Sequence, residues 1–592
     1  MALASLPPAH AQTPPRPAVS QTTFYLHGRI YTNDPAHPWA SAMAVRDGKI
    51  ICIGDISTVM LECAAGENAE TVQLGGRFVM PGFNDAHVHL GGAAIDRLTV
   101  QLNGVGSVDE LQKRLAATVA QHQEGEWITG SGWDQSFWPD KAFPTRAQLD
   151  AVSPKNPVFL THISGHVGVA NSLALAAAGV DKTTPDPPGG KIERDANGAL
   201  TGMLLEDSAM HLVRTKIPEM TEEQLRQGLE LVLEEVAQNG ITSVQDNSDW
   251  EFFGLYHKLK EEGALTVRIT EWLPFENPLQ DLRNMRSEGG TTDAMLKTGL
   301  LKGFLDGALG SHTAALLAPY SDDPSTSGIL TANIDDYRKM AIERDKAGFQ
   351  IAFHAIGDKA NRAALDIFEA VAKANGEHDR RDRIEHAQVV APEDLPRFAQ
   401  LKVIASMQPS HETTDMRWAE QRLGPERSKG AYAWNSLEKS GARLAFGTDY
   451  DVEPLNPMRG LYACTTRELP AEAAIAATAT STSLAGAAPG NVAGAPGASG
   501  APNGGTSGAQ GSAQGDAWQP QEKISLEDCI RAYTTGSAYA QFSEGKKGEL
   551  KLGEYADFII LSADLTKIPP AQYTATKVLR TVVAGRTVYQ AQ

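Results

Sequence analysis

Apolar, strand-like stretches alternate with helical patterns through the middle of the chain. Two of the helical segments are amphipathic and stop at a glycine, residues 221–239 before Gly240 and residues 358–375 before Gly376. The strand-like segments are 78–90, 241–246, 266–272, 300–306, 350–356, 383–390, 402–407 and 443–448. Strands that alternate with helices are typical of a parallel sheet. These eight segments predict an α/β fold, a closed (β/α)8 TIM-like barrel, whose active site lies at the carboxyl ends of the strands.

Short strands that alternate apolar and polar residues mark both ends of the chain. Near the N-terminus they are 24–27, 30–32, 42–45 and 49–53, and near the C-terminus 548–553, 556–561 and 578–589. Asp47-Gly48 and Ala584-Gly585 are turn signals between them. Because the termini of a domain often lie close together, we expect residues 23–77 and 548–592 to form one small β-sandwich domain.

Two long segments interrupt the alternation of strands and helices. Residues from about 91 to 217 occupy the place of a single connection, and their length predicts an inserted subdomain. Residues 471–515 are rich in Ala, Gly, Ser, Thr and Pro. Such a segment cannot bury enough apolar surface to become ordered, so we expect a disordered insertion. The barrel then comprises residues 78–470 and 516–547, with Ser525 as the predicted N-cap of its last helix.

The composition narrows the classes of function. The chain has 592 residues, 42% of them hydrophobic, which is enough for a large core. Its formal charge of -19 and pI near 5.3 argue against a nucleic-acid or anionic-membrane partner, so we expect a small-molecule substrate. No run of about 18 apolar residues is present, which predicts a soluble protein without a membrane span. The oligomeric state stays open, with a homodimer as one alternative.

Two further features bear on the cellular compartment. Residues 1–22 are a disordered tail or the remnant of a signal peptide: Ala9-His10-Ala11 has the small-x-small ending of a cleavage site, but the basic start and the full apolar region are missing. A cytoplasmic and a periplasmic or secreted location therefore both stay open. The four cysteines form no CxxC pair, and we take them to carry no redox information; they are Cys52, Cys63, Cys464 and Cys529.

Two histidines, His87 and His89, stand at the end of the first predicted barrel strand. Residues two apart in a strand point to the same face, so both rings can converge on one point. Taken alone, the two histidines would equally suit the solvent-exposed face of a strand. Polar residues recur, however, on the fourth, fifth, sixth and eighth strands, as Lys302, His354, His386 and Asp449. Each has an ordinary role by itself, a strand-end amine, a core histidine or a helix cap, but the set predicts a metal site.

These residues lead to a family resemblance, which covers the chain from residue 23 to the C-terminus except 471–515. The chain resembles the amidohydrolase superfamily of metal-dependent hydrolases, and more narrowly the branch that contains N-substituted formamide deformylases. The motifs that carry the narrower resemblance are 302–311 (KGFLDGALGS), Gln408-Pro409, Ser164-Gly165-His166-Val167 and Asn171-Ser172. His312 stands where an arginine is expected, which leaves its role open, and Thr448 replaces a common serine.

The resemblance implies a ligand set. His87 and His89 would bind one divalent metal ion and His354 and His386 a second, while Lys302, carboxylated on its amine, would bridge them. Asp449 would bind the first ion and move protons as the catalytic residue. Histidine nitrogens and carboxylate oxygens are ligands that zinc accepts, so one or two zinc ions are the expected cofactors.

The predicted reaction is hydrolysis of a nonpeptide carbon–nitrogen bond in an amide, an N-substituted formamide or a cyclic amide. The alternatives are hydrolysis of esters or carbamates at the same site, and a catalytically inactive barrel that serves as a binding module. All six ligand positions carry competent residues, which favours an enzyme. His166 and Trp133 are candidates for substrate contact in the inserted subdomain, although a buried histidine and a packing tryptophan explain them equally well.

Overall fold

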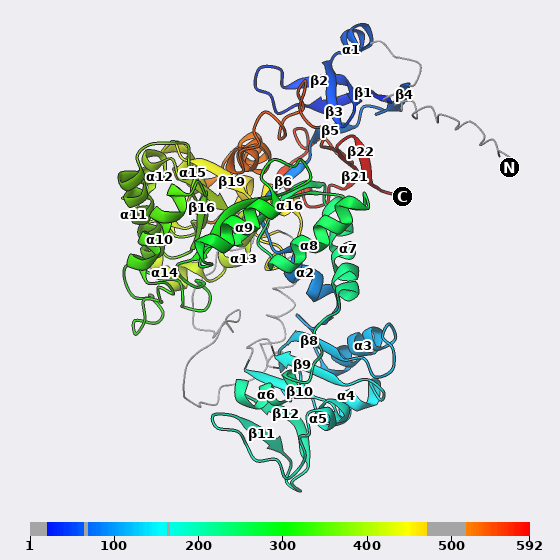
Figure 1. Ribbon diagram of the computed structural model, residues 1–592, viewed down its shortest axis with the longest axis vertical. Coiled ribbons are helices and arrows are strands. Elements are labelled where there is room, and N and C mark those ends of the chain that lie inside the picture. The colour runs from blue at the N-terminus through cyan, green and yellow to red at the C-terminus, as the bar shows by residue number, and fades with distance from the viewer. Residues whose placement is uncertain (1–20, 64–68, 136–137, 163–165, 471–516) are drawn as a thin grey trace, which may run out of the picture.

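The computed structural model describes residues 21–63, 69–135, 138–162, 166–470 and 517–592. Its central element is a sheet of eight parallel strands in the order β19-β18-β17-β16-β15-β14-β13-β6, of which Figure 1 labels β6, β16 and β19. These strands are β6 (Phe83–Val88), β13 (Ile241–Asp246), β14 (Arg268–Pro274), β15 (Leu296–Phe304), β16 (Ile351–Ala355), β17 (Arg383–His386), β18 (Ile404–Met407) and β19 (Arg443–Phe446). A parallel bridge between Val88 and Tyr450 joins the first strand to the segment after the last. The predicted TIM-like barrel is therefore confirmed.

Helices surround this barrel. They are α7 (Glu222–Gln238), α8 (Trp250–Glu261), α9 (Leu279–Gly289), α10 (Ile334–Lys346), α11 (Asp358–Asn375), α12 (Leu395–Leu401), α13 (Pro409–Asp415), α14 (Ala419–Arg427), α15 (Trp434–Lys439), α16 (Pro457–Thr466), α18 (Leu526–Arg531) and α19 (Ser537–Ala540). Helix α7 begins at a capping box, in which Thr221 and Gln224 each bond the backbone of the other. The helices predicted at 221–239 and 358–375 are confirmed, and Ser525 caps α18 as expected.

The chain passes from a terminal sheet into the barrel at Gly82. The segment 78–90, predicted as one barrel strand with a Gly/Pro turn inside it, does turn at this point, but its assignment to one sheet is wrong, because β5 (Phe78–Pro81) and β6 belong to different sheets. The amide of Gly82 donates to the carbonyl of Asp557, and the amide of Phe83 donates to Gly240. A Cβ atom on Gly82 would lie 2.2 Å from a side-chain carbon of Thr242, so this crossing point has room only for glycine.

Strands from both ends of the chain share one hydrogen-bonded sheet where we predicted a β-sandwich. Its order is β22-β21-β20-β5-β1-β2-β3, with β4 beside β1. The bounds are β1 (Thr22–Tyr31), β2 (Trp39–Arg46), β3 (Lys49–Gly54), β4 (Ala69–Gln73), β20 (Phe558–Leu561), β21 (Val578–Val583) and β22 (Arg586–Gln590), with α1 (Ile56–Glu62) after β3. The strand predicted at 548–553 is wrong, because Gly548 and Gly553, with φ of 103° and 89°, turn the backbone there.

A second sheet, in the order β11-β12-β10-β9-β8-β7, interrupts the barrel between α2 (Leu90–Arg97) and α7 and lies apart from it in Figure 1. Its elements are β7 (Val100–Gln101), α3 (Val108–Val119), β8 (Ile128–Trp133), α4 (Arg146–Val152), β9 (Val158–His162), β10 (Val167–Ala170), α5 (Ser172–Ala177), β11 (Lys191–Arg194), β12 (Leu200–Leu205) and α6 (Asp207–Arg214). Leu111, Leu115 and Leu160 belong to a core of its own. The predicted insertion 471–515, and residues 1–20 of the predicted tail, lie outside the described residues.

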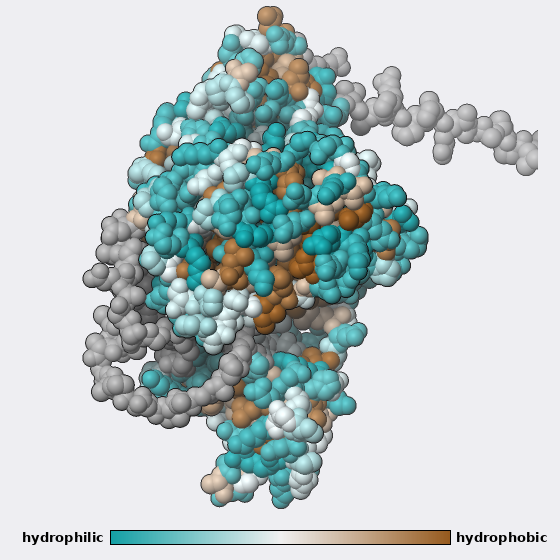
Figure 2. All heavy atoms as spheres, turned by 90° about the vertical axis from the view of Figure 1, so that its left-hand side faces the viewer, coloured by the Kyte–Doolittle hydropathy of each residue, from teal (hydrophilic) through white to brown (hydrophobic). Residues whose placement is uncertain are grey.

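Disulfides join the cysteines in pairs, Cys52 to Cys63 and Cys464 to Cys529. The expectation that the cysteines carry no redox information is therefore wrong. The second pair is 65 residues apart in sequence, and it meets because α16 packs against α18, which no local spacing reveals. The face of the molecule in Figure 2 is mostly hydrophilic. Among the described helices, none has both the length and the apolarity needed to cross a membrane.

Candidate metal centre

The six residues predicted as metal ligands meet at the carboxyl ends of the barrel strands. They come from the end of β6 (His87, with His89 just beyond), β15 (Lys302), β16 (His354), the last residue of β17 (His386) and the loop after β19 (Asp449). The strand ends meet at one mouth because all eight strands are parallel and in register, as the pairing of Ala355 with His386 illustrates.

Asp449 lies at the centre of this cluster. Its Oδ1 is 3.1 Å from Nε2 of His89 and 3.6 Å from Nε2 of His87, and its Oδ2 is 3.9 Å from Nδ1 of His386. Nζ of Lys302 is 3.4 Å from Nε2 of His87. The ring of His354 lies against that of His386, with centroids 4.5 Å apart. The structure thus brings all six together.

Each histidine of the cluster has one ring nitrogen bound to an acceptor outside it. Nδ1 of His87 lies 2.9 Å from Glu385, Nδ1 of His89 lies 3.1 Å from the carbonyl of Asn247, and Nδ1 of His386 lies 2.9 Å from Oε1 of Gln408. In His354 the bound atom is Nε2, 3.2 Å from the carbonyl of Gly307. The remaining nitrogen of each ring keeps its lone pair when the ring is neutral, which is how histidine binds a metal.

Burial keeps three of these rings neutral. It lowers the pKa of His87 to about 4 and that of His354 to about 3, and it holds the pKa of His386 well below its usual range. In His89 burial also disfavours the charged ring, but the hydrogen bond to Asp449 and the charge of that carboxylate outweigh it and raise the pKa. The lone pair of Nε2 in neutral His87 then faces the carboxylate of Asp449, an arrangement that repels unless a cation lies between them. His87, His89 and Asp449 each offer a ligand atom, and these atoms lie within 4.8 Å of one another. The donor set therefore fits a divalent ion such as zinc.

Lys302 is almost fully buried beside the ring of Trp272, whose centroid is 5.2 Å from Nζ. Burial lowers the pKa of Lys302 to about 8, because an ammonium group loses its hydration there. A share of this lysine is therefore neutral near physiological pH. Only the neutral amine can add carbon dioxide, and the addition releases one proton and leaves an anionic carbamate.

A buried arginine, Arg383, binds the backbone and side chains next to the cluster. Arg383 donates to the carbonyl of Ala86 at 2.8 Å and to Oγ of Ser406 at 2.7 Å, and its Nε is 2.7 Å from Oε1 of Glu385. Burial raises the pKa of Glu385, but the charge of Arg383 outweighs it, and the pKa falls to about 2. Glu385 is therefore a carboxylate, which fixes the proton of His87 on Nδ1.

Sequence reasoning missed His411. This residue lies in α13, and its Nε2 is 3.1 Å from Oδ2 of Asp449. Burial disfavours its protonation, yet the hydrogen bond to Asp449 and the charge of that carboxylate raise the pKa of His411 to about 9. The available signal was its position three residues after Gln408, where the proline at the first position of α13 starts a helix directly beyond β18.

The other residues singled out from the sequence lie elsewhere. Trp133 is fully buried in the core of the inserted sheet, with its ring centroid 4.6 Å from that of His162. His166 stands before β10, and its Nδ1 is 2.9 Å from Glu206. Both lie in the insertion, and their contact with substrate stays a prediction. His312 lies in the loop after β15, with Nε2 3.1 Å from Asp322.

Comparisons with known proteins agree with this geometry. A sequence profile described as "Amidohydrolase family" matches residues 70–589. The chain is 34% identical to Protein LONG AFTER FAR-RED 3 of Arabidopsis thaliana, over 98% of this chain and 93% of the relative. It is 26% identical to the N-substituted formamide deformylase of Arthrobacter pascens, over 95% and 98%. The crystal structure of an uncharacterized metal-dependent hydrolase from Pyrococcus furiosus superimposes with a TM-score of 0.69 at 30% identity and covers 92% of this chain and 99% of the other.

Proposed function

The chain belongs to the amidohydrolase family, and we propose that it is a metal-dependent hydrolase of a nonpeptide carbon–nitrogen bond. The observation that carries this proposal is the carboxylate of Asp449 facing Nε2 of both His87 and His89, with the other nitrogen of each ring bound elsewhere. In the proposed site, these three residues would hold one divalent ion, His354 and His386 would hold a second, and Lys302, once carboxylated, would be a ligand that the two ions share. Zinc is the expected metal.

Asp449 is the residue that moves the proton in this proposal. When bound, a divalent ion would lower the pKa of a coordinated water to about 7 and polarise the substrate carbonyl. The Asp449 carboxylate accepts the proton that the attacking water loses and delivers it to the departing nitrogen. An amine requires that proton before it can leave, so one carboxylate serves both halves of the reaction.

His411 is a positioning residue in the same proposal. Its Nε2 contacts Oδ2 of Asp449, while Nδ1 lies 3.8 Å from Glu453, so the ring is fixed on both sides. Held in this way, His411 orients the Asp449 carboxylate toward the histidines on the other side of the site.

The proposed substrates are amides, with N-substituted formamides as the first choice. The similarity to an N-substituted formamide deformylase over almost the whole of both chains supports this choice. To test it, the metal content of the purified protein should be measured, and turnover compared on N-formyl amines, N-acyl amines, cyclic imides and aryl esters. We expect bound divalent metal and hydrolysis of an amide. Turnover of esters alone would favour an esterase, and metal without any turnover a binding module.

We also propose that the protein acts in an oxidising compartment, either periplasmic or extracellular. The two disulfides support this location, because such bonds are rare where thiols are kept reduced. Cell fractionation together with thiol titration of the denatured protein tests the proposal. We expect oxidised protein outside the cytoplasm, and a cytoplasmic, fully reduced protein would contradict it.

A further inference from the structure

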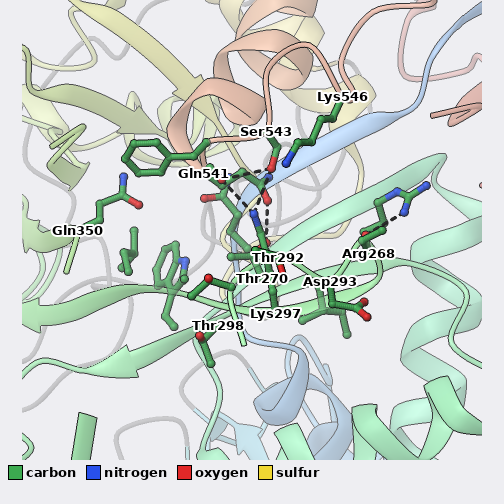
Figure 3. A pocket seen from close by; sticks show the side chains of 18 of the residues that line it. Arg268, Thr270, Thr292, Asp293, Lys297, Thr298, Gln350, Gln541, Ser543 and Lys546 are labelled. Atoms are coloured by element: carbon green, nitrogen blue, oxygen red, sulfur yellow. Dashed lines mark hydrogen bonds between the residues drawn. The ribbon is translucent and has the colours of Figure 1, made fainter. Parts of the chain in front are cut away.

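A cavity opens at the end of the barrel opposite the metal centre. It has a volume of about 420 Å³ and is lined by residues at or near the amino ends of three strands, Arg268 of β14, Lys297 of β15 and Gln350 just before β16 (Figure 3). A volume of this order is within the range of small-molecule sites, roughly 300 to 1,000 Å³.

Trp272 separates this cavity from the catalytic site. Its ring lines the cavity and packs with Leu300 and Ala352 in an apolar layer inside the barrel. On the other side, the ring of His87 lies 4.8 Å from that of Trp272, and Nζ of Lys302 lies 5.2 Å from it. A ligand in the cavity therefore contacts the back of this layer and no group that we assign to catalysis.

Cations gather in the cavity although the whole chain carries a formal charge of -19. The cationic lining residues are Arg268, Arg286, Lys297, Lys546 and Lys547, whereas the lining contains a single carboxylate, Asp293. Such a concentration of positive charge in an acidic protein attracts anions to one place.

The carboxylates near these cations already have partners. Asp293 pairs with Lys260 at 2.5 Å, Asp557 with Arg268 at 2.6 Å, and Glu544 with Arg381 at 2.6 Å. The cavity is lined by three lysines, Lys297, Lys546 and Lys547. Across the described residues, no carboxylate forms an ion pair with these lysines or with Arg286. The cavity therefore has an excess of positive charge.

The lysines are held by neutral acceptors. Nζ of Lys297 donates to the carbonyl of Gln541 and to Oγ of Ser543, both at 3.1 Å (Figure 3). Lys547 is buried and donates to Oγ of Ser243 and, at 3.3 Å, to Oε1 of Gln541. Burial and the charge of Lys546 lower the pKa of Lys297 to about 8, which is the behaviour of an ammonium group without a counter-ion.

We propose that this cavity binds a small, multiply charged oxyanion, either free phosphate or the phosphate group of a phosphorylated small molecule. The anion supplies the counter-charge that Lys297 and Lys546 lack, and it favours the charged form of Lys547, whose pKa burial lowers well below its usual range. Its oxygens accept hydrogen bonds from the ammonium groups, and charge-assisted bonds of this kind are stronger than neutral ones. Nothing in the proposed hydrolysis requires this second site.

Calorimetric titration of the metal-loaded protein tests the proposal, with inorganic phosphate and glycerol 3-phosphate as separate ligands at constant ionic strength. We expect saturable binding and a Tm that rises by about 2 °C or more at saturation. Tighter binding of glycerol 3-phosphate identifies a phosphorylated molecule as the ligand, and tighter binding of phosphate identifies the free ion.

Variants decide where the anion binds. Lys546 is exposed, so Lys546→Gln should fold normally, and we expect it to weaken binding by about tenfold or more. Lys297→Met, on β15, should act in the same direction. Lys182→Gln, an exposed lysine of the insertion, is the matched control and should bind like the wild type. Wild-type affinity in both cavity variants would assign the binding to the metal centre and overturn the proposal, as would an equal Tm rise with sodium chloride.

Discussion

Nδ1 of His87 lies 2.9 Å from Oε2 of Glu385, and both side chains are fully buried. The two residues are 298 positions apart in the chain. Because Arg383 keeps Glu385 ionised, the carboxylate accepts the Nδ1 proton and leaves Nε2 of His87 free to bind a metal. Glu385 and Arg383, inside the barrel, thus set the tautomer of His87, a proposed metal ligand.

Glu385→Gln tests this relationship. An amide oxygen accepts a weaker hydrogen bond than a carboxylate, so the ring of His87 becomes less basic and less firmly oriented. We expect metal affinity to fall by about 10- to 100-fold, measured by competition with a chelator. The control is Glu377→Gln, which removes an exposed carboxylate beside Lys402 and should leave the affinity unchanged. Equal affinities in both variants would show that Glu385 does not tune the site.

Asp449→Asn separates metal binding from proton transfer. The histidines and Lys302 should retain much of the metal, but an amide cannot accept a proton at neutral pH. General acid–base groups contribute about 10²- to 10⁴-fold, and we expect a loss in kcat toward the upper end. Amide substrates should lose more than activated esters, whose leaving groups need no proton. Equal losses on both substrates with the metal retained would contradict the proton-transfer role.

Lys302→Ala should lower metal content and activity together, because the proposed carbamate bridge is lost. Short-chain carboxylates, which can occupy the position of the carbamate, should restore part of both. Metal analysis and turnover with and without added formate or acetate measure this effect. The same additives should not rescue Asp449→Asn, which serves as the control. A variant that keeps its metals and its rate would rule out the bridge.

The lowered pKa of Lys297 predicts that the free energy of unfolding depends on pH. Burial lowers its pKa from 10.5 to about 8, so between these values the unfolded chain binds a proton that the folded chain has released. The contribution of this lysine to stability is therefore most favourable above pH 10.5 and falls as the pH falls through 8. We expect the free energy of unfolding of the wild type, minus that of Lys297→Met, to rise across this window. Denaturant unfolding measures it, and a difference that does not change with pH would contradict the assignment.

The disulfide between Cys464 and Cys529 should stabilise the fold more than the one between Cys52 and Cys63. The two bonds close segments of 65 and 11 residues, and a longer closed segment restricts the unfolded chain more. Replacing Cys464 and Cys529 by alanine should lower the free energy of unfolding by about 2 to 4 kcal/mol. The matched replacement of Cys52 and Cys63 should lower it less, and the reverse order would contradict this reasoning.

The local pattern was sufficient to predict the barrel and the six polar side chains that meet at its mouth. Strand and helix periodicity depends on neighbouring residues, so β13 and α11 were found with bounds close to those in the structure. His354, at the penultimate position of β16, and His386, the last residue of β17, lie at strand ends, where a barrel collects its polar residues. The same local reasoning failed at 78–90, where the backbone moves from one sheet to another: the amide of Gly82 donates to Asp557 and the amide of Phe83 donates to Gly240.

By itself, the sequence determined the fold class, most of the barrel strands and the six side chains that meet at the mouth of the barrel. Tertiary structure alone decided what surrounds them: Glu385 beneath His87, His411 beside Asp449, the disulfide between α16 and α18, and the lysines of the second cavity. Periodicity reports which face of an element is buried, because that depends on residues a few positions apart. Contacts between residues hundreds of positions apart depend on how the elements pack, and no local pattern encodes them.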